Sequence, residues 1–233
     1  MLTLNVTASV PQESRKCAII RFANPGWSDV TVTTAAAAYV LQTLGYKTKE
    51  VFISVPITYL SLAAGDVDVF LGYWDPSMNQ IYKPYAENKT VEILHTNLTG
   101  ANYGLAVPKY LYDAGLTDIK DLAKFSHLLN NKIYGIEPGN DGNQIILSII
   151  NDKKFNINNF QLIESSEQAM LSQADLLISQ KQPIVFLAWE PHPMNIRYDI
   201  KYLTGAENYF GFNKGQLTYT QMQEKISQQN VLM

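Results

Sequence analysis

The sequence has little of what metal-binding, disulfide-bonded and most catalytic proteins are built from. Its 233 residues include one cysteine, Cys17, which excludes an internal disulfide and any multi-cysteine metal site. A three-histidine metal site would need all of the three histidines, and no His-Glu-x-x-His spacing is present. Neither a Gly-x-Ser-x-Gly elbow nor a Walker-type phosphate loop occurs. We therefore expect no metal, no cofactor and no catalytic residue.

Charge and long apolar runs are also scarce. The 18 basic and 21 acidic residues leave a net charge of -3 and form no long run of either sign, so nucleic acid and anionic membrane surfaces are poor partners. No apolar run approaches the ~20 residues of a membrane span, and "MLTLNVTASV" lacks the basic start of a signal peptide. We expect a small-molecule ligand and a chain that does not itself span a membrane.

Short apolar runs alternate with amphipathic stretches along most of the chain, which predicts an α/β architecture with mostly parallel sheets. The segment "TNLTGAN" at 96–102 and a return near 204–211 predict two lobes, residues 1–97 plus 212–233 and residues 98–211. The predicted helices are 31–44, 56–64, 141–151 and 166–180. The predicted strands are 17–23, 47–54, 67–73, 91–98, 103–107, 132–136, 160–164, 183–189 and 199–203.

All three tryptophans lie at the carboxyl ends of predicted strands. Trp27, Trp74 and Trp189 follow or end such strands, and Tyr103 lies just beyond the predicted crossover. Ligands of open α/β sheets bind at this edge. A single tryptophan in such a place is usually a packing residue, but several aromatic faces together form a cage for an organic cation. A quaternary ammonium donates no N–H hydrogen bond, so each face contributes roughly 0.5–2 kcal/mol through cation–π attraction.

Polar residues beside the same strand ends allow two interpretations. Asp29, Asn140 and Asp141 each precede or begin a predicted helix, where such side chains are favoured as N-caps. The same three side chains would also face the predicted crevice and meet the polar end of a ligand. The sequence leaves both roles open for Asp29.

Six segments, in chain order, resemble the choline- and glycine-betaine-binding proteins of bacterial ABC importers, and most of all the choline-binding branch. They are "PGWSDVTVTTAAAAYVLQTLGY", "DVDVFLGYWDPSM", "NLTGANYGLAVP", "KIYGIEPGNDGN", "ESSEQAML" and "PIVFLAWEPHPMN", and the similarity covers about residues 17 to 211. The resemblance implies a two-lobed periplasmic-binding-protein fold of type II, outside the cytoplasm, that closes on its ligand and delivers it to an ABC permease. It implies no enzymatic activity.

The resemblance also implies residue roles. Trp27, Trp74, Tyr103 and Trp189 would surround the trimethylammonium group, Asp29 would bind the choline hydroxyl, and Asn140 with Asp141 would line the second lobe. Carboxylates accept a hydroxyl hydrogen, whereas the carboxylate of glycine betaine needs donors, so choline or a choline ester such as acetylcholine is favoured over glycine betaine.

The chain departs from the family near its end. Relatives continue past "YFGFNKG" with further secondary structure, so we expect a fold that is short at its C-terminus, and Cys17 lacks the partner cysteine found in many relatives. An incomplete first lobe, one completed by another subunit and one of marginal stability are the alternatives. Two other functions stay open: a sensor or interaction module that keeps the cage without transport, and an enzyme acting on choline esters through Ser28.

Overall fold

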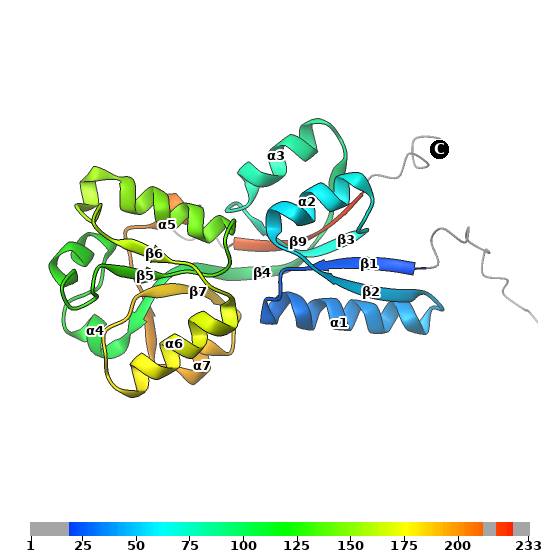
Figure 1. Ribbon diagram of the computed structural model, residues 1–233. Coiled ribbons are helices and arrows are strands. Elements are labelled where there is room, and N and C mark those ends of the chain that lie inside the picture. The colour runs from blue at the N-terminus through cyan, green and yellow to red at the C-terminus, as the bar shows by residue number, and fades with distance from the viewer. Residues whose placement is uncertain (1–18, 212–217, 226–233) are drawn as a thin grey trace, which may run out of the picture.

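The computed structural model describes residues 19–211 and the strand 218–225. These residues form an α/β molecule of two lobes that lie side by side, with helices on both faces of each sheet (Figure 1). Cys17, the predicted start of the first strand at residue 17, and most of the predicted lobe segment 212–233 lie outside the described residues. Among the helices of the described part, none is both long enough and apolar enough to cross a bilayer.

The first lobe is built on a sheet in the order β2-β1-β3-β9-β4. Its strands are β1 (Ile19–Asn24), β2 (Lys47–Phe52), β3 (Val69–Asp75), β9 (Thr218–Lys225) and the first part of β4 (Val91–Pro108). Helix α1 (Ser28–Thr43) covers one face, and α2 (Val55–Ala64) and α3 (Asn79–Glu87) cover the other (Figure 1). Pro56 lies in the first turn of α2, and Gly65 ends that helix in the left-handed conformation at φ 80°.

The second lobe surrounds a sheet in the order β4-β7-β5-β6, with β8 on the other side of β4. Its strands are the second part of β4, β5 (Lys132–Tyr134), β6 (Gln161–Ile163), β7 (Phe186–Glu190) and β8 (Ile200–Tyr202). The main helices are α5 (Asp141–Asn151) and α6 (Glu167–Ser179). Shorter ones are α4 (Lys109–Asp113), η2 (Ile119–Phe125), η3 (Lys153–Phe155), α7 (Met194–Arg197) and α8 (Glu207–Phe210).

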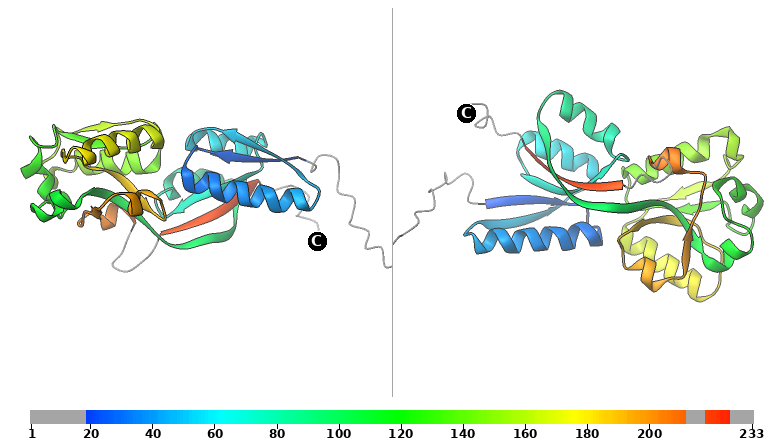
Figure 2. Two further views of the ribbon diagram at one scale, coloured as in Figure 1. Left: turned by 90° about the horizontal axis from the view of Figure 1, so that it is seen from below. Right: turned by 180° about the vertical axis from the view of Figure 1, so that it is seen from behind.

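Strand β4 joins the two lobes as one long ribbon (Figure 2). Residues up to Ala101 pair with β9, and residues from Asn102 onward pair with β7 and then β8. The predicted break at 96–102 is therefore wrong, because "TNLTGAN" continues the strand. The pairing of β4 with β9 is irregular in this segment, with β-bulges between Thr96 and Ala101. Bulges bend and twist a strand without ending it. The predicted division at 97/98 stays a prediction.

The predicted mostly parallel sheets are also wrong in part. The pairs of β1 with β2 and β3, and of β5 with β6 and β7, are parallel. The pairs that involve β4 and β9 are all antiparallel, because β4 passes from one sheet into the other and β9 returns beside it. Sequence patterns identified the parallel βαβ units and missed α3, β9 and the short helices.

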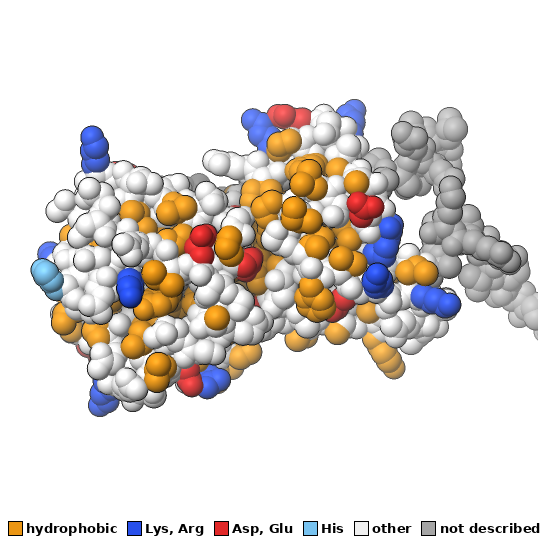
Figure 3. Space-filling view, in the orientation of Figure 1, with side chains coloured by type: hydrophobic (Ala, Val, Ile, Leu, Met, Phe, Trp, Pro, Cys, Tyr) orange, Lys and Arg blue, Asp and Glu red, His pale blue; other side chains and the backbone are white. Residues whose placement is uncertain are grey.

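A continuous apolar core runs through both lobes. In the first lobe, however, large apolar side chains also lie on the surface, and the space-filling view shows them gathered over α2 and its neighbours (Figure 3). The outward face of α1 is apolar as well, with Val32 and Tyr39 each 70% exposed. Helix α1 therefore buries only Val30 and Thr34 fully, although it has almost no charged residues.

Candidate functional site

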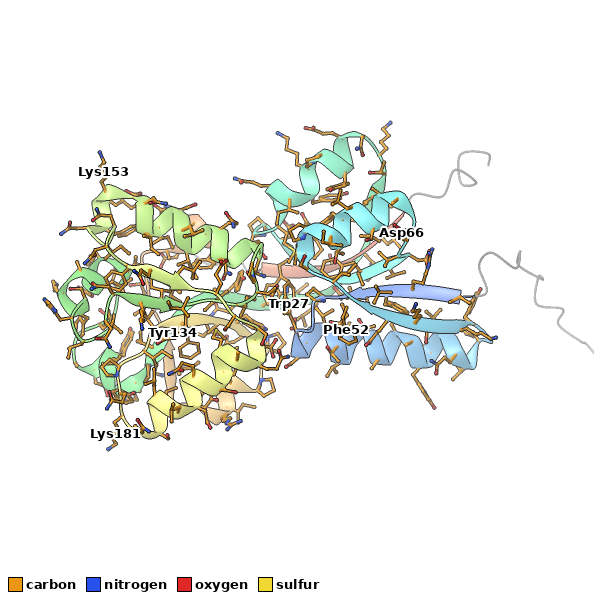
Figure 4. All side chains as sticks on the ribbon, viewed as in Figure 1. Trp27, Phe52, Asp66, Tyr134, Lys153 and Lys181 are labelled. Carbon is orange, nitrogen blue, oxygen red and sulfur yellow. The ribbon has the colours of Figure 1, made fainter. Side chains whose placement is uncertain are left out.

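The four aromatic residues selected from the sequence converge between the lobes. Trp74 in β3 and Trp27 just after β1 come from the first lobe, and Tyr103 in β4 and Trp189 in β7 come from the second. All four are at most 6% exposed. The ring centroids of Trp74 and Tyr103 are 5.3 Å apart, and those of Tyr103 and Trp189 are 6.5 Å apart. The label of Trp27 in Figure 4 marks this junction, whereas Phe52 and Tyr134 lie away from it.

These rings enclose a small cavity. The cavity has a volume of only about 10 Å³. In this closed arrangement the rings nearly touch, so a trimethylammonium group would enter as the lobes move apart and the walls adjust. The cavity is lined by Trp27, Trp74, Tyr103, Ile136, Asn140, Asp141 and Trp189.

Six of the seven predicted site residues therefore line one cavity, and Asp29 does not. Asp29 lines a separate apolar groove of about 890 Å³ beside the cage. Helix α1 begins at Ser28 with Trp27 as its N-cap residue, so Asp29 lies within the first turn and is not the N-cap. Its Oδ1 atom is buried and has no hydrogen-bond partner among the described residues.

Asn140 has a structural role that the sequence only suggested. Its Oδ1 accepts hydrogen bonds from the N–H groups of Gly142, at 2.8 Å, and Asn143, so Asn140 is the side-chain N-cap of α5. The same oxygen accepts the hydroxyl hydrogen of Tyr103 at 3.2 Å. One amide thus begins the helix and fixes one aromatic wall of the cavity.

Three carboxyl groups at the site have raised pKa values. Burial raises the pKa of Asp141 to about 6 and that of Glu137 to about 7. Burial, together with repulsion from Glu167, raises the pKa of Asp29 to about 6. Neither carboxyl oxygen of Asp141 has a well-formed hydrogen bond to a described residue. The nearby Ser77 hydroxyl nevertheless lowers the pKa of Asp141 and so offsets part of the rise caused by burial. Among the described residues, none of these three carboxyl groups forms an ion pair with a lysine or arginine, although His192 lowers the pKa of Asp29 in part. Buried carboxylates without such a partner attract a cation.

The second lobe also contacts the turn that ends β1. The indole Nε1–H of Trp27 lies 3.0 Å from both carboxylate oxygens of Glu137, to which it donates. The Ser28 N–H donates to Glu167 at 3.0 Å, and the Ser28 hydroxyl donates to the same carboxylate. The Gln168 amide donates to the Gly26 carbonyl at 2.8 Å. Residues 26–28 are therefore held by three side chains of the other lobe.

Three residues of this junction were not predicted from the sequence: Ile136, Glu137 and Glu167. Glu137 lies in the segment "GIEPGND", from which only Asn140 and Asp141 were predicted as site residues. Glu167 begins a predicted helix, where an acidic residue is ordinary. Only the three-dimensional arrangement shows that both side chains reach across to the first lobe.

Among the described residues, the geometry does not bring a histidine base to the Ser28 hydroxyl. Glu167 lies between Ser28 and His192, so the Ser28 hydroxyl donates to a carboxylate and the histidine does not contact it. A serine nucleophile needs direct contact with its base. Within the described ranges, no three His, Cys, Asp or Glu side chains are grouped in a way that would hold a metal ion.

Comparison with known proteins places the chain beside ABC-transporter binding proteins. The family model described as "Substrate binding domain of ABC-type glycine betaine transport system" matches residues 18–230. An uncharacterized protein of Chromohalobacter salexigens, ORF1, is 50% identical over 144 residues, which are 61% of this chain and 93% of that protein.

Two solved structures of ABC-transporter choline-binding protein are similar over nearly the whole chain. The structure in complex with choline is 43% identical with a TM-score of 0.89, covering 94% of this chain and 76% of the other. The unliganded semi-closed structure is 44% identical with a TM-score of 0.83, covering 93% and 75%. These likenesses confirm the predicted two-lobed periplasmic-binding-protein fold, and the backbone is more similar to the choline-bound arrangement.

Proposed function

The chain belongs to the family of substrate-binding domains of ABC-type glycine betaine transport systems, and from this premise we propose that it binds choline in the aromatic cage between its lobes. Membership confirms the predicted family, whose members are extracytoplasmic solute-binding proteins and not enzymes. The chain thus serves a transporter by binding a small quaternary ammonium compound. The choline ligand, the residue roles and the permease contact are our proposals.

The observation that supports the proposal most is the combination of several aromatic faces and one buried carboxyl group, that of Asp141, in one cavity. Trp74, Tyr103 and Trp189 supply ring faces, and each face would contribute roughly 0.5–2 kcal/mol to binding a desolvated cation. Asp141 brings a buried carboxyl group whose oxygens have no hydrogen-bond partner in the described structure. A quaternary ammonium satisfies both, since it offers charge without N–H groups.

The polar groups near the cage favour choline over glycine betaine. No lysine or arginine is among the residues that line the cavity, so a betaine carboxylate would meet Asp141 without a compensating cation. A choline hydroxyl can donate to a carboxylate. Trp189 has a buried Nε1–H without a partner in the described part, and this donor suits the oxygen of either ligand.

Asp29 lies outside the cavity lining, and we propose that it meets the hydroxyl end of choline once the ligand separates the walls. Its unpartnered Oδ1 supports this role. Asp29→Asn should then weaken choline binding by about tenfold and leave tetramethylammonium, which has no hydroxyl, less affected. Equal losses for the two ligands would show that Asp29 acts through charge alone.

Delivery to an ABC permease and a periplasmic location follow from the family as proposals for this chain. The ligand itself can be tested directly. Because all three tryptophans lie at the cavity, a titration of intrinsic fluorescence with choline should give a saturable change at micromolar concentrations. A stronger response to glycine betaine than to choline would reverse our assignment, and no response to either at millimolar concentration would refute it.

A further inference from the structure

The side-chain hydrogen bonds between the lobes concentrate on one short turn, residues 26–28. Trp27 of this turn also lines the cavity. The Gly26 carbonyl accepts a hydrogen bond from a side chain of the second lobe. Trp27 and Ser28 donate hydrogen bonds to side chains of that lobe. The partners come from two elements, the segment before α5 and the first turn of α6. Because these partners belong to opposite lobes, every one of these hydrogen bonds breaks when the lobes separate.

Glu167 has the most enclosed position in this network. Its side chain is 1% exposed and accepts hydrogen bonds from the Ser28 N–H and the Ser28 hydroxyl. Helix α1 has no side-chain cap of its own, since its N-cap residue is Trp27. The Glu167 carboxylate therefore occupies the N-terminus of α1 from the other lobe, where the unpaired N–H groups and the helix dipole favour a negative charge.

His192 holds the Glu167 carboxylate in place. The Met194 N–H donates to Nδ1 of His192 at 3.0 Å, so the ring hydrogen is on Nε2 and points to Glu167, 3.1 Å away. The His192 side chain is 3% exposed. Both residues belong to the second lobe, so this pair can persist when the lobes are apart.

We propose that Glu167, oriented by His192, is a closure residue: it caps α1 across the cleft only when the lobes are closed, and thereby raises the affinity for any ligand that closes them. This inference rests on the proposed function. Glu167 is absent from the residues that line the cavity, so its effect on affinity passes through the closed population and not through ligand contact. It is a positioning residue for Trp27, which neighbours Ser28.

A closure residue has a signature that distinguishes it from a ligand contact. Removing it lowers the affinity for every ligand by the same factor, because the closed form is the same whichever cation it encloses. The loss lies mainly in faster dissociation, since opening of the lobes releases the ligand. A residue such as Asp29, which we place at the ligand hydroxyl, changes the ratio between ligands.

The test measures dissociation constants and dissociation rates of choline and tetramethylammonium for wild type, Glu167→Gln and Asp175→Asn. Asp175 is the matched control, because it lies on the same helix, is an acid and pairs with Arg197 on the surface of the second lobe. We expect Glu167→Gln to weaken both ligands equally, by about tenfold or more, and Asp175→Asn to leave both unchanged. Equal constants for wild type and Glu167→Gln, or a loss confined to choline, would overturn the inference.

A second variant keeps the test decisive if Glu167→Gln folds poorly. Ser28→Ala removes one of the hydrogen bonds to Glu167 from the first lobe and leaves the buried Glu167–His192 pair intact. It should weaken both ligands by one common factor, and the loss in the double variant should be smaller than the two single losses combined. Additive losses would contradict the hydrogen bond between Ser28 and Glu167.

The outcomes distinguish the two proposals. Wild-type protein that binds neither cation refutes the proposed function and the closure role together, whereas equal binding by wild type and variants refutes only the closure role.

Discussion

Single side chains give this site its chemistry, and Trp189 is the clearest example. Its ring lies edge-on to Tyr103 at 6.5 Å and is 3% exposed, so it forms one wall of the cavity. We predict that Trp189→Ala weakens choline binding by about 1–2 kcal/mol, or roughly tenfold, because one aromatic face is lost. Titration calorimetry measures the change. Trp189→Phe keeps a ring face and should lose less, and equal losses in the two variants would contradict cation–π attraction at this wall.

The raised pKa values predict how binding depends on pH. Asp29 and Asp141 have pKa values of about 6, and Glu137 has a pKa of about 7, mainly because burial disfavours their charged forms. A bound cation stabilises those charged forms and lowers the three pKa values, so binding releases protons between about pH 5 and 7. Affinity for choline should therefore rise with pH over this range, by about tenfold from pH 5 to pH 8.

Calorimetry in buffers of different ionisation enthalpy counts the protons released on binding. Near pH 6 the count should be positive, and it should fall in Glu137→Gln and Asp141→Asn. Proton uptake, or an affinity that does not change from pH 5 to pH 8, would show that these carboxyl groups do not interact with the bound cation.

Among the helices and strands, α5 has a beginning that the sequence predicts well. The segment "GND" combines a cap residue with a flexible glycine, and the helix begins at Asp141 as expected. The side chain of Asn140 both caps this helix and accepts the Tyr103 hydroxyl hydrogen. Asn140 can therefore be both the N-cap of α5 and a residue of the ligand site.

This dual role predicts a stability effect that can be separated from the charge of the site. Asn140→Ala should lower the free energy of unfolding by about 1 kcal/mol, which corresponds to a melting temperature lower by about 2–4 °C. Asn140→Ser keeps a side-chain N-cap oxygen without adding a charge beside Glu137 and Asp141, and should lose less stability than Asn140→Ala. Thermal unfolding followed by circular dichroism measures both, and an unchanged Asn140→Ala would contradict the capping role.

A second prediction concerns Gly142, in the first turn of α5. A methyl group there would lie 2.7 Å from Cδ2 of Leu187 and would also collide with the Tyr103 ring. Gly142→Ala should therefore displace Tyr103 and reduce choline affinity, although alanine is the better helix former. The matched control is Gly115→Ala, where the added methyl group meets no neighbour but φ is 104°, so strain alone is introduced. Equal affinity in the two variants would contradict the steric argument.

Local chemistry determines some elements of this chain, and distant partners determine others. The helices with caps and apolar spacing, such as 141–151, and the three tryptophans at strand ends were predicted correctly, because local chemistry determines them. Strand β4 was divided wrongly at "TNLTGAN", since polar turn residues and a bulged strand look alike without the partner strand. Glu137 and Glu167 were missed because their importance lies in contacts more than 100 residues away along the chain.

In the molecule as a whole, closure of the lobes is coupled to the charge of the ligand. The closed lobes bury Asp141 and bring Asp29 and Glu137 to a cleft that contains no lysine or arginine in its cage lining. Interlobe hydrogen bonds at residues 26–28 favour the closed form, while repulsion between the carboxylates opposes it. A cation between the lobes removes the repulsion and leaves the hydrogen bonds, which explains why closure would depend on a positively charged ligand.

A calorimetric titration of the wild-type protein with choline and with 3,3-dimethylbutan-1-ol shows whether the cavity recognises the positive charge. The two molecules have nearly the same shape and the same hydroxyl, but the second has a neutral carbon in place of the ammonium nitrogen. We predict micromolar binding of choline, and binding of the neutral alcohol that is at least about a hundredfold weaker. Comparable affinities would mean that the cavity binds by shape and apolar contact alone, and would contradict the cation cage.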